Sequence, residues 1–277
     1  MTPPPLTHDI PESPGQTATR YEVDQQVATI TLFRPERLNA WTRVMNAEYR
    51  AHLERAAADP AVRVIVVTGA GRGFCAGQDL GDRLASGDTR PDLGATIGTF
   101  YNPLVQKLRA LPFPVIAAVN GVAAGAGANI ALACDIVLAG KSAKFVQAFA
   151  KIGLVPDSGG TWFLPRLVGA ARARALSLLA EPLPAETAEQ WGLIWKAVDD
   201  DKLIPDAEKM CAQFAAGPTF GFAQIKQALD ASETNGLGAQ LELERDLQRK
   251  AGFSPDYAEG VRAFMDKRAP VFTGKGD

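Results

Sequence analysis

Short apolar runs recur between residues 20 and 200 and predict the strands of a sheet. Val27–Leu32 alternates and is rich in β-branched residues, which is typical of a strand. Val62–Val67, Val115–Val119 and Ile136–Ala139 are continuous apolar runs, which favour buried strands. A further strand is predicted at Leu193–Val198. Helical patterns separate these runs, so this part of the chain alternates strand and helix.

Helical spacing of apolar residues is clearest in Trp41–Ala58, which ends where Asp59-Pro60 breaks the pattern. The other predicted helices are Phe100–Leu111, Ala170–Ala180, Ala185–Trp191, Lys202–Ala216, Thr219–Ser232, Leu237–Lys250 and Tyr257–Lys267. We therefore expect three regions: a disordered lead-in over 1–19, rich in Pro, Thr and Ser, an α/β core over 20–200, and a helical region over 201–277. The polar stretch 82–98 is a candidate lid.

Composition narrows the possible functions. With 277 residues and 47% hydrophobic content, the chain can bury a full core. A net charge of −2 gives no electrostatic basis for binding nucleic acid, and no apolar run is long enough to span a membrane. The three cysteines have no disulfide or zinc spacing, which fits a reducing cytoplasm. His8 and His52 do not support a histidine metal site or a catalytic triad. We expect no metal.

Two glycine-rich turns each follow a buried strand. Gly69–Gly73 does not match a dinucleotide fingerprint, because Phe74 stands where its third glycine belongs. The remaining candidates are Phe74–Leu80 and Gly121–Gly127, which can each present backbone N–H groups at the mouth of a pocket. Two such donors directed at one oxygen form an oxyanion hole. In the alternative interpretation, the glycines only allow the turns to pack closely.

Asp157 is the only carboxylate in the otherwise mostly apolar or cationic stretch Ser142–Arg166. A carboxylate that loses water among apolar side chains holds a proton more readily near neutral pH, as an acid/base catalyst requires. Pro156 precedes it and Ser158-Gly159-Gly160 follows, which predicts a turn. Asp157 is therefore either a proton carrier or a turn residue that caps the next helix.

Three segments resemble the crotonase (enoyl-CoA hydratase/isomerase) superfamily: FCAGQDL, PVIAAVNGVAAGAGANIALACDIVLA and SAKFVQAFAKIGLVPDSGGTWFLPRLVG. The resemblance runs from about Tyr21 to the C-terminus. It implies an α/β fold, the ClpP/crotonase-like spiral of ββα units, with a helical C-terminal region. It also implies a homotrimer or a dimer of trimers that acts on an acyl-CoA. No separate cofactor is expected, because the CoA is part of the substrate.

The resemblance also implies roles for individual residues. The backbone N–H groups of Gln78 and Ala126 would bind the thioester oxygen, and the carbonyl of Ala76 would accept the adenine amino group. Phe264 and Lys267 would close the site from the same chain or from a neighbouring subunit. The residues implied for binding CoA and substrate are Arg37, Leu38, Ala76, Asp79, Leu80, Phe264 and Lys267.

Departures from the hydratase pattern favour isomerisation. Hydratases of this superfamily carry two glutamates, and Asn129 and Phe149 stand at those positions here. Neither can act as a base, so we expect very slow hydration. Asp157 matches the single aspartate of isomerase and dehalogenase members. Dehalogenation is disfavoured because Phe149 stands where those members usually have tryptophan.

The segments GLVPDSGGTW, ELERDLQRKAGFSPDYAEGV and FTGK resemble the branch of the superfamily that acts in phenylacetate degradation. This implies conversion of ring 1,2-epoxyphenylacetyl-CoA to oxepin-CoA, together with isomerisation of 3-enoyl to 2-enoyl thioesters. Two alternatives stay open. One is a generic enoyl-CoA isomerase or weak hydratase. The other is an acyl-CoA binding protein without turnover.

Overall fold

The computed structural model describes residues 17–81 and 92–276. Its main sheet has six strands in the order β1-β2-β3-β5-β7-β10. Their bounds are β1 Thr19–Asp24, β2 Val27–Leu32, β3 Val64–Gly69, β5 Val115–Val119, β7 Ile136–Gly140 and β10 Lys196–Val198. β1 and β2 form an antiparallel hairpin, and the other neighbours in the sheet pair in parallel. The predicted buried strands are thus confirmed.

A second sheet of short strands runs beside the first, in the order β4-β6-β8-β9. Its strands are β4 Gly73–Cys75, β6 Val122–Ala124, β8 Lys144–Val146 and β9 Leu183–Pro184. Each of the strands β3, β5 and β7 leads directly into one strand of this second sheet, and β5-β6 leads on into a helix. This is the repeating unit of the predicted ββα spiral, whose α/β class is confirmed. The second sheet was missed because strands of two or three residues carry almost no periodicity.

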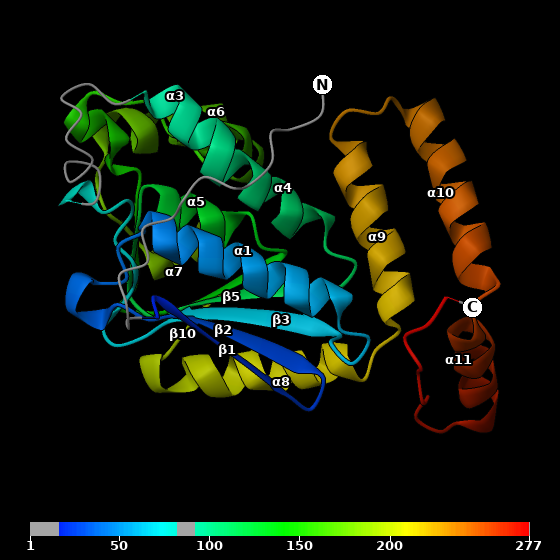
Figure 1. Cartoon of the computed structure of the whole chain (residues 1–277). Helices are drawn as coiled ribbons and strands as arrows, with labels where there is room; N and C mark the ends of the chain where they lie inside the picture. The colour runs from blue at the N-terminus through cyan, green and yellow to red at the C-terminus, as the bar shows by residue number, and fades with distance from the viewer. Residues whose placement is uncertain (1–16, 82–91, 277) are drawn as a thin grey trace.

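Helices cover both faces of the main sheet (Figure 1). The larger core packs one face against α1 Arg43–Ala58, α4 Asn102–Ala110, α5 Ala126–Leu132, α6 Gly160–Leu179 and α7 Ala185–Gln190. The other face packs against α8 Leu203–Ala215, which buries Leu203, Ala207, Cys211 and Ala215 over β3, β5 and β7. The predicted boundary at 200/201 is therefore wrong in placing α8 in the C-terminal region. The apolar stripe of α8 completes the core.

Local sequence explains where α1 and α6 begin and end. Thr42 caps α1 by accepting a hydrogen bond from the Met45 N–H, and the extended residue Asp59, which precedes a proline, ends it. α6 begins ten residues earlier than the predicted helix, at Gly160. Gly169, with φ +77°, interrupts it, so the predicted helix corresponds to its second half. Glycine tolerates this φ, so the chain can break the helical conformation at Gly169 and resume it afterwards.

The N-terminal boundary also differs from the prediction. Residues 1–16 lie outside the described residues, but Ala18 and Thr19 are buried and β1 begins at Thr19. The Glu48 carboxylate accepts hydrogen bonds from the N–H groups of Ala18 and Thr19, at 2.9 and 2.8 Å, and from the Thr19 hydroxyl. These contacts come from a residue far along the chain, so local composition could not indicate them.

Three helices extend away from the layered core: α9 Thr219–Ser232, α10 Leu237–Gly252 and α11 Pro255–Asp266 (Figure 1). α9 is tied to the core by ion pairs of Lys226 with Asp135, Arg109 with Asp230, and Arg166 with Glu233. α10 packs on α9, and α11 packs on α10. Many apolar side chains of these helices are exposed, including Ile225, Leu229, Leu237, Leu241, Tyr257, Val261, Phe264 and Met265.

Candidate functional site

The backbone of the loop after β4 is fixed by the turn that precedes α1. The Trp41 N–H donates to the Gly77 carbonyl at 2.7 Å, and the Trp41 carbonyl accepts from the Asp79 N–H at 2.9 Å. Gln78 therefore lies between two backbone anchors. Gly77 has φ +89°, and a methyl group there would approach the Ala124 carbonyl oxygen to 2.9 Å. Only glycine allows the loop to come this close to β6.

The second glycine-rich turn leads into α5. Gly125 has φ +52°, and its N–H donates to the Val146 carbonyl at 2.8 Å. Asn129 N–H bonds the Gly125 carbonyl, so the N–H groups of Ala126 and the next two residues have no acceptor within the helix. A methyl group on Gly125 would lie 3.9 Å from the Gly77 Cα, so the two turns abut. The fold thus brings both predicted donor segments together.

Asp157 lies in a tight turn at the start of α6. Its carbonyl accepts from the Gly160 N–H at 2.9 Å, and its carboxylate accepts from the Ser158 hydroxyl at 3.0 Å. Ser158 and Gly159 both have left-handed φ values, of +50° and +82°. The residue at the N-cap of α6 is Gly159, two positions after Asp157. The carboxylate is therefore not at the helix-capping position that the alternative interpretation assigned to it.

The predicted apolar wall around Asp157 is only partly formed within one chain. Phe149 is buried, but the side chains of Val155 and Ile152 are 75% and 52% exposed. Asp157 itself is half-buried. η3 (Ala148–Ile152) and the segment after it lie at the surface, so part of the apolar environment expected for Asp157 is not supplied by these residues within one chain.

Asn129 and Phe149, which are expected to stand where hydratases carry glutamates, lie next to these turns. Phe149 Cζ would be 3.7 Å from a methyl group on Gly125. Asn129 is fully buried, and its Nδ2 donates to the Asp157 carbonyl at 2.8 Å. Neither side chain can take up a proton at neutral pH. Cys75, beneath α5, is no alternative nucleophile, because burial raises the pKa of its thiol to about 12.

The residues predicted to bind CoA divide into two groups. Five lie along one edge of the fold, around the loop after β4: Arg37, Leu38, Ala76, Asp79 and Leu80. Within this group, the Ala76 N–H donates to the Leu38 carbonyl, and Asp79 pairs with Arg34 at 3.0 Å. Arg37 and Leu80 are exposed.

Phe264 and Lys267 lie elsewhere, at the end of α11 on the far side of the C-terminal helices (Figure 1). Phe264 is 82% exposed. Within one chain these two residues do not meet the others, which corrects the interpretation that they close the site of their own chain. α11 contacts α10 rather than the loop after β4, so the length of this helical arm separates them.

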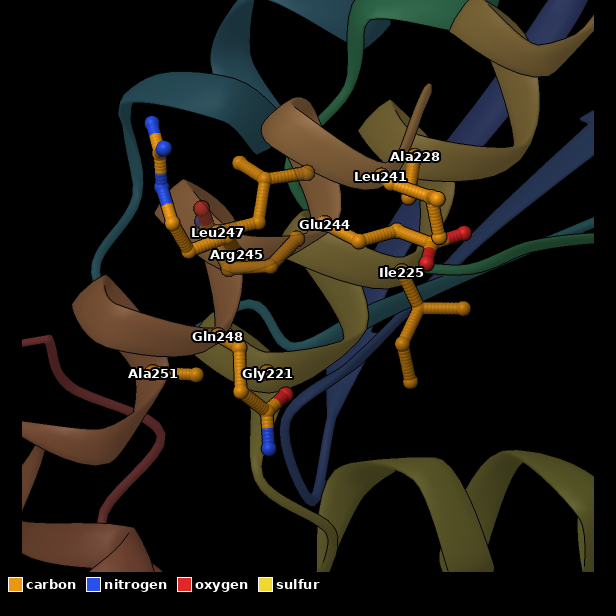
Figure 2. A pocket seen from close by; sticks show the side chains of 10 residues that line it. Gly221, Ile225, Ala228, Leu241, Glu244, Arg245, Leu247, Gln248 and Ala251 are labelled. Atoms are coloured by element: carbon orange, nitrogen blue, oxygen red, sulfur yellow. The ribbon is translucent and has the colours of Figure 1, made fainter. Parts of the chain in front are cut away.

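The described part of the chain has hollows at two places that bear on the site. A groove of about 610 Å³ lies between α9 and α10, lined by apolar residues such as Ile225 and Leu241 with Glu244, Arg245 and Gln248 (Figure 2). None of the predicted site residues lines it. The other, of about 620 Å³, lies between α4 and α6 and is lined by Gly159, Trp162 and Phe163 among others. It adjoins the Asp157 turn through Gly159, but none of the predicted site residues lines it either.

Two buried or half-buried asparagines support the site and were missed in the sequence. Asn39 is fully buried and donates to the Ala70 and Gly73 carbonyls at 3.0 and 2.8 Å. Asn120 donates to the Gly69 and Gly71 carbonyls, both at 2.8 Å. Together they hold the loop that leads into β4. The available signal was an Asn-Gly pair after the buried strand β5, which marks a turn but not its partners.

Metal sites and membrane-spanning helices are both absent from the described part of the chain. Within 17–81 and 92–276, no group of His, Cys, Asp and Glu is arranged to hold a metal ion. No helix in the same ranges is both long and apolar enough to cross a membrane. The predicted lid over 82–98 falls largely outside the described residues, and its last part forms α3, Leu93–Thr96.

Known proteins match this chain over most of its length. It is 56% identical over 254 residues to the 1,2-epoxyphenylacetyl-CoA isomerase of Escherichia coli (strain K12), covering 91% of this chain and 97% of the relative. It is 50% identical to a probable enoyl-CoA hydratase of Rhodobacter capsulatus, covering 92% and 98%. A solved structure, a putative enoyl-CoA hydratase/isomerase from Mycobacterium abscessus, superposes with a TM-score of 0.88 at 41% identity, covering 93% and 100%.

A family model also matches. The model described as enoyl-CoA hydratase/isomerase covers residues 22–275, which include both glycine-rich turns, the Asp157 turn and the C-terminal helices. Together with the close relatives and the shared fold, this places the chain: it belongs to the enoyl-CoA hydratase/isomerase family.

Proposed function

We propose that this protein is an acyl-CoA isomerase that converts ring 1,2-epoxyphenylacetyl-CoA to oxepin-CoA and 3-enoyl-CoA to 2-enoyl-CoA. The observation that carries the proposal is one carboxylate, Asp157, beside two abutting turns, with Asn129 and Phe149 where hydratases have glutamates. The 56% identity to a 1,2-epoxyphenylacetyl-CoA isomerase supports the choice of substrate.

The two turns supply the electrostatic part of the chemistry. The N–H groups of Gln78 and Ala126 would donate to the thioester oxygen. Negative charge grows on that oxygen when a proton leaves C2, so fixed donors stabilise the transition state more than the ground state. Because both donors are backbone groups held by Gly77 and Gly125, no side chain has to reorganise during the reaction.

Asp157 would supply the proton transfer in the enoyl reaction. Its carboxylate would take a proton from C2 and return it to C4, so the double bond moves from C3–C4 to C2–C3 with no net change in atoms. A group that both removes and returns the proton suits an isomerase, because no water has to be activated. The epoxide-to-oxepin step also conserves every atom, and there the site would orient the ring and polarise the thioester.

We propose further that the working form is a homotrimer or a dimer of trimers. Phe264 and Lys267 cannot reach the CoA-binding edge of their own chain, so a neighbouring copy would bring them there. The exposed apolar side chains of α9, α10 and α11, and the groove between α9 and α10, would then face other copies (Figure 2). Covering such a surface is favourable because it removes apolar area from water.

A direct assay tests the proposed function. Purified protein is offered epoxyphenylacetyl-CoA and, separately, a 3-enoyl-CoA, and the products are identified by mass and absorbance. We expect both to be converted to isomers of unchanged mass. Conversion of the enoyl substrate alone would favour a generic isomerase. Binding of both thioesters with no turnover would favour a binding protein instead.

A further inference from the structure

Two buried amide side chains connect β8 to the Asp157 turn. Gln147 follows β8 directly, and its Nε2 donates to Asn129 Oδ1 at 2.8 Å. Asn129 Nδ2 in turn donates to the Asp157 carbonyl at 2.8 Å. Asn129 is fully buried and Gln147 is 4% exposed. We call these two residues the amide relay.

The direction of the relay is fixed by the Asp157 carbonyl. A carbonyl oxygen only accepts hydrogen bonds, so Asn129 must turn its NH₂ group towards Asp157 and its oxygen towards Gln147. Gln147 must then donate with its own NH₂ group. This leaves Gln147 Oε1 buried without a hydrogen-bond partner among the described residues. A buried acceptor without a partner destabilises the fold. The other hydrogen bonds of the relay must therefore offset this cost.

The relay is attached to the same backbone that presents the oxyanion donor. Asn129 lies one helical turn after Ala126 in α5. Val146, next to Gln147, accepts the Gly125 N–H at 2.8 Å. Both residues of the relay are therefore connected to the backbone around Ala126: Asn129 through α5, and Gln147 through its neighbour Val146. The relay thus links the position of the Asp157 turn to that of the Ala126 N–H.

The contact between α5 and the Asp157 turn leaves no room for adjustment. A methyl group on Gly160 would lie 2.3 Å from Asn129 Nδ2. Ser158 is also 2% exposed and held at φ +50°, a conformation that residues other than glycine rarely adopt. A strained, buried turn needs surrounding contacts to keep its shape.

From this geometry we propose that Asn129 and Gln147 are positioning residues, whose relay sets the distance between the Asp157 carboxylate and the Ala126 N–H. The inference rests on the proposed function, in which Asp157 moves the proton. Asn129 thus has a use of its own at a position where hydratases carry a glutamate. It holds the neighbouring turn with an N–H donor that a carboxylate lacks.

The experiment compares Asn129→Leu and Gln147→Leu with the matched control Asn46→Leu. Asn46 is 1% exposed and its Nδ2 donates to the Phe100 carbonyl at 3.2 Å, so it is also a buried asparagine bonded to the backbone. It has no contact with the Asp157 turn. For each variant, kcat for 3-enoyl isomerisation, the Kd of butyryl-CoA and the unfolding midpoint are measured.

We expect kcat to fall by about 10- to 100-fold in Asn129→Leu and Gln147→Leu, because small displacements of a catalytic group carry large losses in rate. The Kd should stay within about twofold, since the oxyanion donors are unchanged. The kcat of the double variant should be little lower than that of the less active single variant, because the two residues act through one connection. Asn46→Leu should keep kcat within about threefold of the parent, even if its unfolding midpoint falls as much as those of the relay variants.

Asp157→Asn separates the two proposals. If it is inactive while both relay variants match Asn46→Leu, the relay has no positioning role and the proposed function stands. If it keeps most of the parent kcat for 3-enoyl isomerisation, the proton-transfer role proposed for Asp157 and the positioning role of the relay are both overturned. If Asn129→Leu does not fold, Gln147→Leu decides, since it breaks the relay at its outer end. A loss of binding equal to the loss of kcat would also overturn the relay.

Discussion

Asp157 is the only side chain to which the proposed mechanism gives a proton, and its replacement isolates that role. Asp157→Asn keeps the shape of the side chain and can still accept from the Ser158 hydroxyl, but it cannot take up a proton at neutral pH. We expect kcat for 3-enoyl isomerisation to fall by about 10²–10⁴, the usual contribution of a positioned acid/base group. The Kd of a non-reactive acyl-CoA should change little. A kcat within a few-fold of the parent would show that Asp157 is only a turn residue.

Individual residues also decide whether this protein can act as a hydratase. The unaltered protein should add water to crotonyl-CoA far more slowly than the tens of turnovers per second typical of enzymes. From the sequence alone, glutamates at both positions, Asn129→Glu and Phe149→Glu, are expected to raise this activity if the pocket geometry is kept. The structure revises that prediction, and we expect the double variant to stay slow. The geometry would not be kept, because Asn129 is fully buried and a carboxylate in its place cannot donate to the Asp157 carbonyl. We expect isomerisation to fall as well. Hydration by the double variant at enzymatic rates would contradict the role of Asn129.

At the scale of elements, the least exposed of the three ion pairs that join α9 to the core is Lys226 with Asp135. Lys226 Nζ lies 2.7 Å from Asp135 Oδ2, with the two side chains 12% and 17% exposed, and Lys226 also donates to the Phe113 carbonyl. Lys226→Met leaves Asp135 without its cation. We expect a loss of about 2–4 kcal/mol in the free energy of unfolding at pH 7, because removing one partner of a buried pair exposes the other to the full penalty of desolvation.

The pH dependence of that loss has a definite sign. Burial raises the pKa of Asp135 above its ordinary value of 3.8, and Lys226 opposes the shift. Without Lys226 the pKa rises further. A carboxyl with a raised pKa in the folded state stabilises the fold below its unfolded pKa and loses that contribution as pH rises through the folded pKa.

Urea unfolding at pH 4 and pH 7, at a fixed protein concentration, measures this difference. The variant should lose more at pH 7 than at pH 4. Lys141→Met is the matched control, because its partner Asp199 is 64% exposed, and solvent screening should make its loss of stability much smaller than that of Lys226→Met. Equal losses in the two variants would show that the Lys226–Asp135 pair does not anchor α9.

For the whole molecule, the position of Lys267 connects assembly with binding. If a neighbouring copy supplies Lys267, light scattering at micromolar concentration should show a trimer or a multiple of it. A stable monomer at that concentration would contradict the proposed assembly.

Lys267→Ala should then raise KM for acyl-CoA substrates more than it lowers kcat, and the effect should shrink at high salt, since exposed charges are screened. Lys250→Ala, at the exposed end of α10, is the control and should leave KM unchanged. An unchanged KM in Lys267→Ala at low ionic strength would remove Lys267 from the site.

Local chemistry alone determined much of this protein. The short, continuous and β-branched apolar runs of β3, β5 and β7 favour buried strands, and the period of 3.6 residues marks α1, α9 and α10 closely. The two glycine-rich turns and Asp157 were identified in the sequence because glycine and an isolated carboxylate have few uses in apolar surroundings. Motifs of that kind also indicated the family, because each is a continuous stretch of sequence that can be compared directly with known families.

The tertiary structure decided what depends on residues far apart in the chain. α8 joined the core because its apolar stripe meets β3, β5 and β7, which no local pattern reveals. Phe264 and Lys267 were separated from the other predicted binding residues because α9, α10 and α11 form an arm that extends from the core, to which ion pairs join α9 (Figure 1). The amide relay also appeared only in the fold. Hydrogen bonds between Gln147, Asn129 and Asp157 join three segments, and sequence periodicity carries no information about such contacts.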